Sequence, residues 1–168
     1  MKLIARKGLL SLLMVTMLSL VSCATDAEKE ATDDSMVSDA ADNYALELNG
    51  TSDNNTAGGL NTIYFDYDSS ELSASAKSTL EENANFLKNN QNVDIQVEGH
   101  ADERGGHQYN LALGERRART VKNYLVALGV IDARVSIVSY GKEKPLAFGH
   151  DAEAWSQNRR ANFMVTAK

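Results

Sequence analysis

Cysteine, proline and histidine are scarce in this 168-residue sequence, which contains one, one and three of them respectively. A single cysteine cannot form a disulfide within the chain, so a disulfide-stapled scaffold is excluded. No second histidine stands at metal-ligand spacing from His100, so the sequence does not favour a metal centre. The only proline, Pro145, should lie outside any central strand, because proline cannot donate a hydrogen bond to a sheet.

The sequence also lacks an apolar run long enough for a permanent membrane span, which needs roughly 20 consecutive apolar residues. The apolar stretch at 8–21 is shorter, follows three basic residues and precedes an acidic tract. This arrangement predicts a secretory signal peptide over residues 1–22. The only cysteine, Cys23, then stands at the expected cleavage position.

Basic and large apolar residues are rare in the next segment. Residues 24–60 hold nine acidic residues and one lysine, with small and polar residues between them. A segment of this composition cannot bury enough surface to offset its ordering entropy, so we expect a disordered acidic linker that ends at residue 60. Residues 61–168 suit one small domain, and their 13 basic and 14 acidic residues leave it nearly neutral. This balance, together with the expected export, argues against nucleic-acid binding.

Aromatic residues make up only 7% of the sequence, which further limits the possible functions. The basic run GERRAR at 114–119 lacks stacking aromatics at suitable spacing, and this again disfavours a nucleic-acid site. Phe148 and Trp155 are more typical of core or rim positions than of a binding platform.

The apolar pattern of residues 61–168 predicts four strands. Each candidate is rich in strand formers, and the second alternates apolar with polar residues, as a half-buried strand does. The four segments are 61–68, 93–98, 134–140 and 159–167.

Helical spacing of apolar residues predicts two longer helices, at 76–87 and at 111–128, and Gly129 supplies a stop signal after the second. A loop with one short helix is expected between the last two strands. The fold class is therefore predicted to be α/β (α+β), a two-layer sandwich in which a small mixed β-sheet carries helices on one face.

Three arginines, Arg116, Arg117 and Arg119, lie on the second predicted helix. At about 100° per residue, Arg117 falls inside the apolar stripe, whereas the other two face away from it. Burying a guanidinium in the body of a domain costs several kcal/mol of desolvation unless a carboxylate pairs with it. One interpretation is a fixed partner within the protein, for which the candidates are Asp66, Asp68, Asp102 and Glu103. The other is an external carboxylate bound by Arg117, with Asp102 nearby for an external ammonium.

The loop VEGHADERGG, residues 97–106, concentrates polar side chains between glycines. Metal ligation by His100, Asp102 and Glu103 would lack a second histidine, and we expect His100 to be a hydrogen-bonded loop residue. Asp102 and Glu103 could also form an acid/base pair for hydrolysis. Adjacent residues in a tight loop usually point apart, and no nucleophile partner is visible, so we do not expect an enzyme.

Several ordered motifs resemble one family, and the resemblance covers essentially all of residues 61–168. The chain is similar to the peptidoglycan-associated lipoproteins of the Tol-Pal system, lipid-anchored members of the OmpA-like domain family. The motifs are YFDYDSSEL (64–72), VEGHADERG (97–105), YNLALGERRA (109–118), VSYGKEKP (138–145) and NRRA (158–161). The resemblance implies a β-α-β-α-β-β sandwich. In addition, LVSC at 20–23 resembles the lipobox of bacterial lipoproteins, in which the cysteine is lipidated.

The resemblance also implies non-covalent binding of peptidoglycan, through the diaminopimelate of the stem peptide, which presents a carboxylate and an ammonium on one carbon. Asp102 would pair with the ammonium and Arg117 with the carboxylate, both as charge-assisted contacts. Further site residues implied in the same way are Tyr67 and Asp68 as one wall, with Gly106, Asn110 and Leu113.

One departure lies inside the implied site. Relatives often have Thr-Pro after DERG, where this chain has Gly106 and His107. We expect the loss of a hydroxyl contact and of some loop rigidity.

Taken together, the implied organisation is a signal peptide (1–22), a lipidated Cys23 with its linker (23–60) and a peptidoglycan-binding domain (61–168). Ala24 replaces the aspartate that retains many lipoproteins in the inner membrane, so the expected location is the outer membrane, facing the periplasm. The resemblance implies a tether that supports envelope integrity and cell division, without a cofactor. The alternative is a protein-recognition module whose main ligand is a TolB-like periplasmic propeller protein.

Overall fold

The computed structural model describes residues 45–168. The expected signal peptide, the lipidation site at Cys23 and the larger part of the expected linker therefore lie outside the described residues. In the described part, no helix combines the length and the apolar character that crossing a membrane requires.

Four strands form one mixed sheet. They are β1 (Ile63–Tyr64), β2 (Asp94–His100), β3 (Val135–Gly141) and β4 (Arg160–Ala167). Their order across the sheet is β1-β4-β2-β3. β2 and β3 are parallel, whereas β4 runs antiparallel to both of its neighbours, β1 and β2.

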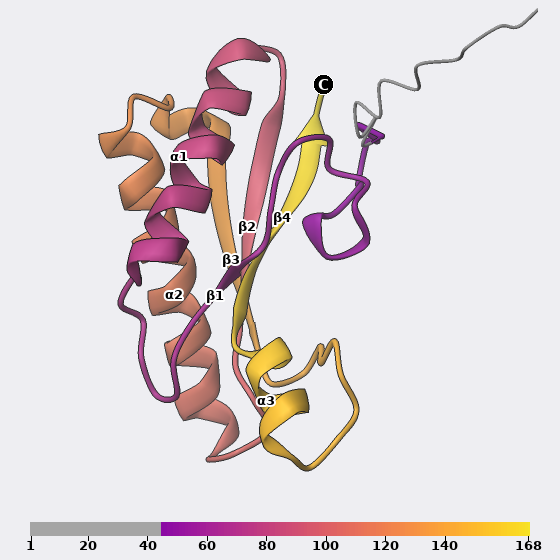
Figure 1. The fold of residues 1–168 in the computed structure, drawn as a ribbon, viewed down its shortest axis with the longest axis vertical. Coiled ribbons are helices and arrows are strands. Elements are labelled where there is room, and N and C mark those ends of the chain that lie inside the picture. The colour runs from indigo at the N-terminus through magenta and orange to yellow at the C-terminus, as the bar shows by residue number, and fades with distance from the viewer. Residues whose placement is uncertain (1–44) are drawn as a thin grey trace, which may run out of the picture. The chain divides into compact units, whose positions relative to one another are not determined.

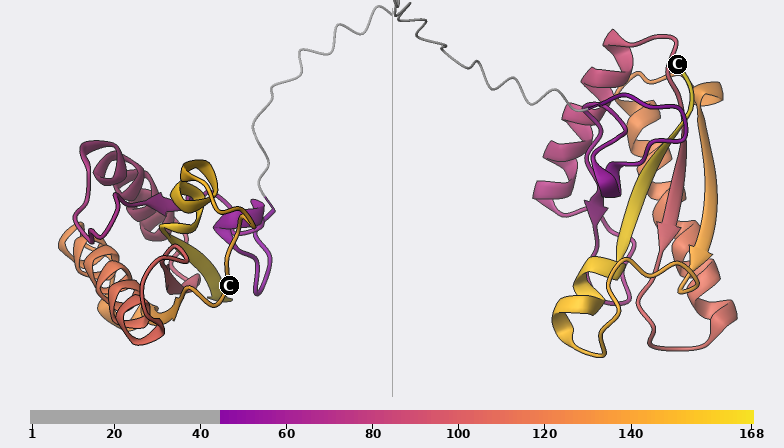
Figure 2. Two further views of the ribbon diagram at one scale, coloured as in Figure 1. Left: turned by 90° about the horizontal axis from the view of Figure 1, so that it is seen from below. Right: turned by 90° about the vertical axis from the view of Figure 1, so that its right-hand side faces the viewer.

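Helices connect these strands. They are α1 (Ala74–Asn89), α2 (His107–Ala127) and α3 (Ala152–Asn158), with the 3-10 turns η1 (Ser52–Asn54) and η2 (Asp132–Arg134). α1 and α2 lie side by side over one face of the sheet (Figure 1), and the view along the layers in Figure 2 shows the same arrangement. The predicted two-layer α/β sandwich is confirmed, and α3 is the short helix expected between the last two strands.

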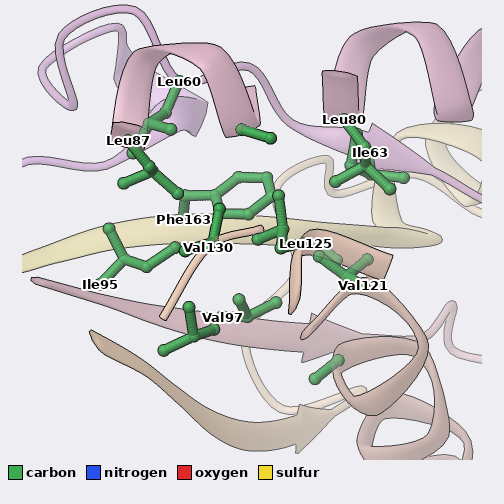
Figure 3. Close-up of a cluster of buried hydrophobic side chains, with 14 of the residues drawn as sticks. Leu60, Ile63, Leu80, Leu87, Ile95, Val97, Val121, Leu125, Val130 and Phe163 are labelled. Carbon is green, nitrogen blue, oxygen red and sulfur yellow. The ribbon is translucent and has the colours of Figure 1, made fainter. Parts of the chain in front are cut away.

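The hydrophobic core fills the space between the two helices and the sheet (Figure 3). Ile95 and Val97 of β2 are buried on the helix side, as their alternation with polar residues predicts. The residues that meet them include Leu80, Leu87, Val121, Leu125 and Phe163. Each such side chain contributes about 1.5–3 kcal/mol on burial, so the core fixes where α2 lies on the sheet.

The first predicted strand, 61–68, is shorter in the structure. Only Ile63 and Tyr64 pair with β4. Phe65 still donates its N–H to the carbonyl of Arg159 at 2.9 Å, but the chain then turns away. Asp68 adopts a left-handed conformation in this turn, with φ of 52°. The turn brings the backbone of residues 66–69 over α2, where its carbonyls become acceptors for the site described below.

The boundary of the folded domain requires a correction, because residues 45–60 are packed onto the domain and are not a disordered linker. Asn49 donates to the carbonyl of Val165 at 2.8 Å, and Thr51 forms a bridge with Met164, so this segment continues the edge of the sheet past β1. Ala57 and Leu60 enter the hydrophobic core. A few apolar residues and backbone hydrogen bonds are therefore enough to fold this segment onto the domain, although its average composition is polar.

A buried polar network holds this segment to the sheet face opposite the helices. Asp53 accepts a hydrogen bond from Nε of Arg160 at 2.8 Å, in an ion pair whose two side chains are almost fully buried. The hydroxyl of Ser52 donates to Asn162 Oδ1 at 2.8 Å and accepts the backbone N–H of Phe163 at 3.0 Å. Composition alone could not reveal this network, because its partners lie more than 100 positions away in the sequence.

Ser52→Ala is expected to lower the free energy of unfolding by about 1–3 kcal/mol, because the buried N–H of Phe163 loses its acceptor. Urea denaturation followed by circular dichroism measures the change. The matched control is Ser78→Ala, a serine exposed on α1, which should change stability by less than about 0.5 kcal/mol. Equal stabilities for the two variants would contradict the packing of residues 45–60 onto the domain.

Candidate functional site

Two glycines place α2 directly against β2. A Cβ atom added at Gly99 would lie 1.9 Å from the carbonyl oxygen of Gly114, and one added at Gly114 would lie 2.7 Å from the carbonyl oxygen of Gly99. Backbone therefore packs on backbone, which no larger residue would allow. This close approach brings Arg117, one turn further along α2, beneath the end of β2 and the loop that follows it.

A cavity of about 230 Å³ opens at this end of the sheet. Six of the seven predicted binding residues line it: Tyr67, Asp68, Asp102, Asn110, Leu113 and Arg117. Gly106 does not line it and is instead the N-cap of α2. The lining also includes four residues that sequence reasoning did not single out, Arg104, Gly105, Tyr109 and Arg159. All four stood inside or next to the motifs that carried the resemblance.

Arg117 is 0% exposed at the floor of the cavity, as its position in the apolar stripe predicts. Its guanidinium donates to three backbone carbonyls, those of Ser69 at 2.8 Å, His100 at 2.7 Å and Asp66 at 3.0 Å. The expectation that a carboxylate of the protein pairs with Arg117 is thus corrected, because within residues 45–168 its partners are carbonyls. Since a guanidinium has five N–H groups, Nη1 and Nη2 each keep one more.

The electrostatics at the floor favour an anion. Burial, together with the neighbouring charge of Arg159, lowers the pKa of Arg117 to about 10. Two guanidiniums held together in a partly dry site repel each other, and a carboxylate between them would relieve the repulsion. Arg159 is itself held by the carbonyl of Phe65, to which its Nε donates at 3.0 Å.

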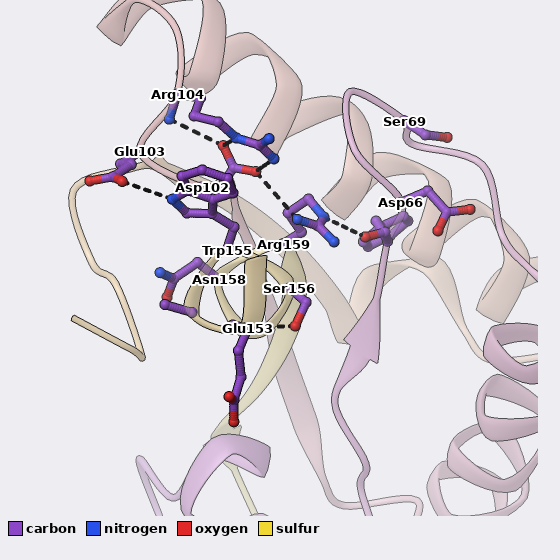
Figure 4. Close-up of polar contacts among 12 residues, drawn as sticks. Asp66, Ser69, Asp102, Glu103, Arg104, Glu153, Trp155, Ser156, Asn158 and Arg159 are labelled. Atoms are coloured by element: carbon purple, nitrogen blue, oxygen red, sulfur yellow. Dashed lines mark hydrogen bonds and ion pairs between the residues drawn. The ribbon is translucent and has the colours of Figure 1, made fainter. Parts of the chain in front are cut away.

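Asp102 faces the same space and is held mainly by Arg104 (Figure 4). Arg104 donates from Nε to Oδ1 at 3.2 Å and from Nη2 to Oδ2 at 2.5 Å, and its backbone N–H donates to Oδ1 at 3.1 Å. Arg159 adds a longer contact to Oδ2, at 3.5 Å. Burial alone would raise the pKa of Asp102, but the hydrogen bonds from Arg104 outweigh it and the pKa lies below its usual value. Asp102 is therefore an anion at neutral pH.

Arg104 is fixed in turn by two aromatic rings. Its guanidinium carbon lies 4.0 Å from the ring centroid of Tyr67 and 4.1 Å from that of Trp155. Such contacts contribute about 0.5–1 kcal/mol each at exposed sites, so the stack makes one wall of the cavity rigid. Elsewhere in the lining, Tyr109 donates its hydroxyl to Asp68. With three arginines and two aspartates, the lining has a net charge of +1 and presents both signs at close range.

Comparison with known proteins places the chain in a family. Residues 64–159, more than half of the chain, match the OmpA family. The chain belongs to the OmpA family. Among curated relatives, the peptidoglycan-associated lipoprotein of Pseudomonas aeruginosa is 52% identical over 101 residues, which make up 60% of each chain. That of Rhizobium meliloti is 52% identical over 99 residues, 59% of this chain and 56% of the relative. The match thus spans less than two thirds of the length of these relatives.

A solved structure agrees with this assignment. The crystal structure of the peptidoglycan-associated lipoprotein from Burkholderia pseudomallei is 45% identical, with a TM-score of 0.60. The likeness covers 62% of this chain and 88% of that one. The resemblance noted from the motifs is therefore confirmed, and so is the OmpA-like architecture of the sheet and helices.

The expectation for His100 was wrong. In this OmpA-family domain it is the last residue of β2, and neither ring nitrogen has a hydrogen-bond partner among residues 45–168. The ring stacks on Tyr140, with centroids 5.7 Å apart. Burial, reinforced by the charge of Arg160, lowers the pKa of His100 to about 3, so the imidazole is neutral and acts as packing. The cause is that β2 continues two residues beyond its predicted end at residue 98, through a bulge between Gly99 and His100.

Asp102 and Glu103 have separate partners, as expected of adjacent loop residues. Glu103 accepts a hydrogen bond from Nε1 of Trp155 at 2.7 Å and contacts Nδ1 of His150 at 2.7 Å. Trp155 and His150 hold the pKa of Glu103 below its usual value. Across residues 45–168, no group of three or more potential ligand side chains is placed to hold a metal ion.

Proposed function

We propose that this chain binds peptidoglycan non-covalently through the cavity between β2, α2 and the turn at 66–69. The observation that carries the proposal is the pairing of charges in one small space, with two guanidiniums at the floor and two carboxylates on the walls. A ligand carbon that bears both an ammonium and a carboxylate has matching chemistry. Diaminopimelate at the end of a stem peptide is such a group, and relatives named for their association with peptidoglycan support this choice.

The geometry suggests how each half of the ligand is bound. The ammonium replaces the contact between Arg159 and Asp102, which at 3.5 Å is the longest that Asp102 makes. The carboxylate meets Arg159 and then the two remaining N–H groups of Arg117, which become accessible only when the cavity widens, since Arg117 has no exposed surface. The net charge of +1 favours a ligand with one surplus carboxylate, and stem peptides carry further free carboxylates.

The arrangement of the domain is compatible with a tether. The start of the described part lies beside the C-terminus, because Nζ of Lys168 donates to the carbonyl of Leu46 at 2.8 Å. Ala167, next to the C-terminus marked in Figure 1, pairs with Asp94, the first residue of β2. The cavity instead follows the last residue of β2. Seven residues of strand separate the two ends by about 20 Å. The proposed wall-binding cavity is thus at the opposite end of the sheet from residue 45, where the described part of the chain begins.

The proposed organisation is a signal peptide at 1–22, lipid on Cys23, a linker over 24–44 and a wall-binding domain at 45–168. A linker of this length could span at most about 70–75 Å when fully extended. The lipid would hold the chain on the outer membrane, facing the periplasm, because several acyl chains together bind a membrane firmly. Within a Tol-Pal system, such a link between membrane and wall would support envelope integrity and cell division.

Asp102→Asn is expected to weaken binding to diaminopimelate-containing wall sacculi by about 10- to 100-fold, because a hydrogen bond to a charged group contributes about 1.5–3 kcal/mol. Co-sedimentation of the purified chain with sacculi measures the loss. Asp132→Asn is the matched control, because Asp132 is exposed in η2 and lies away from the cavity.

Each result has a clear meaning once circular dichroism has shown both variants to be folded. A parent chain that sediments while Asp102→Asn stays in solution supports the wall-binding cavity. Equal sedimentation of all three would place the wall site elsewhere. A parent that stays in solution would reject wall binding and favour recognition of a TolB-like propeller protein, for which the exposed rings of Tyr67 and Tyr109 at the cavity mouth offer contacts.

A further inference from the structure

A second cavity of about 350 Å³ lies next to the first. Its lining combines apolar residues with polar side chains at the rim, the mixture that is typical of small-ligand sites. The lining residues used below are Glu103, Lys142, Pro145, Phe148, His150 and Asn158.

The two cavities share the loop at 103–105 as a common wall. Nζ of Lys142, which lines the second cavity, donates to the carbonyls of Glu103 at 3.2 Å and of Gly105 at 2.8 Å, and Gly105 lines the first cavity. On the other side of the loop, Trp155 joins Glu103 of the second cavity to Arg104 of the first (Figure 4). The two cavities therefore lie on either side of this loop.

Phe148 is presented to solvent by a loop that is held in place. It is 92% exposed, although the residues before it are fixed by the buried side chain of Asn158. Asn158 accepts the N–H groups of Leu146 at 2.7 Å and Ala147 at 3.0 Å, and donates to the carbonyl of Ala147 at 2.8 Å. Pro145 restricts the same loop further. The backbone that carries the Phe148 ring is thus held at the cavity rim, which reduces the entropy lost on binding a ligand.

We propose that the second cavity is a subsite for an amino-sugar ring of the glycan strand to which the bound stem peptide is attached. The C–H face of a sugar ring would stack on Phe148, and its hydroxyl and acetamido groups would bond to the rim. The rim can supply both kinds of partner, since Glu103 has exposed acceptor oxygens, Lys142 has a third N–H group and His150 is well exposed. The inference rests on the proposed wall-binding function and deepens it.

The test is calorimetric titration of the purified full chain with three ligands. These are a diaminopimelate-containing stem peptide, the same peptide carrying its disaccharide, and the disaccharide alone. We expect the glycopeptide to bind roughly five- to tenfold more tightly than the peptide, from the apolar area buried against Phe148. Phe148→Ala should reduce this ratio to about one and leave the affinity for the free peptide unchanged. Ile131→Ala is the control, because Ile131 is 62% exposed and lines neither cavity.

The outcomes separate this inference from the function on which it rests. Free peptide that binds with the same affinity as glycopeptide, or a preference that survives Phe148→Ala, would overturn the sugar subsite alone. Equal weakening of both ligands by Phe148→Ala would assign Phe148 to the peptide and also overturn it. Absence of binding by all three ligands would reject both proposals. Binding of the disaccharide that depends on Phe148, without binding of the peptide, would keep the subsite and reject the clamp for diaminopimelate.

Discussion

Arg117→Ala is expected to lower the free energy of unfolding by about 3–5 kcal/mol, in addition to any effect on ligand binding. The guanidinium is the common donor for carbonyls in three separate segments, at Asp66, Ser69 and His100. Alanine would leave these carbonyls without their donor, of which that of His100 is buried and the other two are partly buried. Each unsatisfied buried group costs about 1–3 kcal/mol. It would also leave a void the size of an arginine side chain, which the surrounding backbone cannot fill.

Urea denaturation followed by circular dichroism measures this loss. Arg116→Ala is the matched control, because the neighbouring arginine is exposed and its guanidinium carbon lies 5.8 Å from the ring centroid of Tyr109. It should change stability by less than about 0.5 kcal/mol. A loss below about 1 kcal/mol for Arg117→Ala would mean that the three carbonyls find other donors, and that Arg117 is not the connection between turn, strand end and helix.

The structural role of Arg117 changes how binding experiments on this cavity should be interpreted. Arg117→Ala removes a proposed ligand contact and also the hydrogen bonds that hold the cavity floor together. Its effect on binding therefore cannot be separated from its effect on stability. Asp102→Asn separates them better, because asparagine keeps the shape of the side chain and Arg104 retains its two aromatic neighbours. The contrast between the two variants is itself informative: Arg117 supports the floor on which Asp102 and Arg159 are presented.

Some features of the site could be predicted from the sequence because they depend on local periodicity. The apolar stripe of α2 placed Arg117 inward, and the alternation in β2 predicted which residues face the helices. The resemblance then brought together residues that lie far apart in the chain, and six of them line one cavity. Their role in binding stays a prediction until ligand is added.

Other features depend on contacts that no local pattern contains. Arg159 and Asp102 are separated by 57 positions, and their approach follows from the antiparallel pairing of β4 with β2. The carbonyl partners of Arg117 could not be foreseen, since every residue has a carbonyl and only the turn at 66–69 decides which ones converge. The packing of residues 45–60 was missed for a related reason. The acidic average composition of residues 24–60 gives no sign that the segment contributes two core residues and one buried ion pair.

Gly99→Ala is expected to lower stability by at least about 3 kcal/mol and to abolish binding to wall sacculi. The added Cβ would stand 1.9 Å from the carbonyl oxygen of Gly114, and both atoms belong to rigid elements. Ordinary contact begins at 3.4 Å, so α2 would have to move by about 1.5 Å relative to β2. Such a shift exceeds what a hydrogen bond tolerates, and Arg117 would lose the carbonyl of His100, which now lies 2.7 Å away.

Calorimetric unfolding should show a melting temperature lower by about 10 °C or more for Gly99→Ala. Gly106→Ala is the control, because a Cβ there meets nothing within 4 Å and its φ of −75° suits any residue. A Gly99→Ala chain that melts normally and still sediments with sacculi would show that α2 can move without loss of the site. If it melts early yet retains binding, the cavity does not depend on the spacing between β2 and α2. The close approach of the two glycines is therefore expected to be a condition of the binding site as well as of the fold.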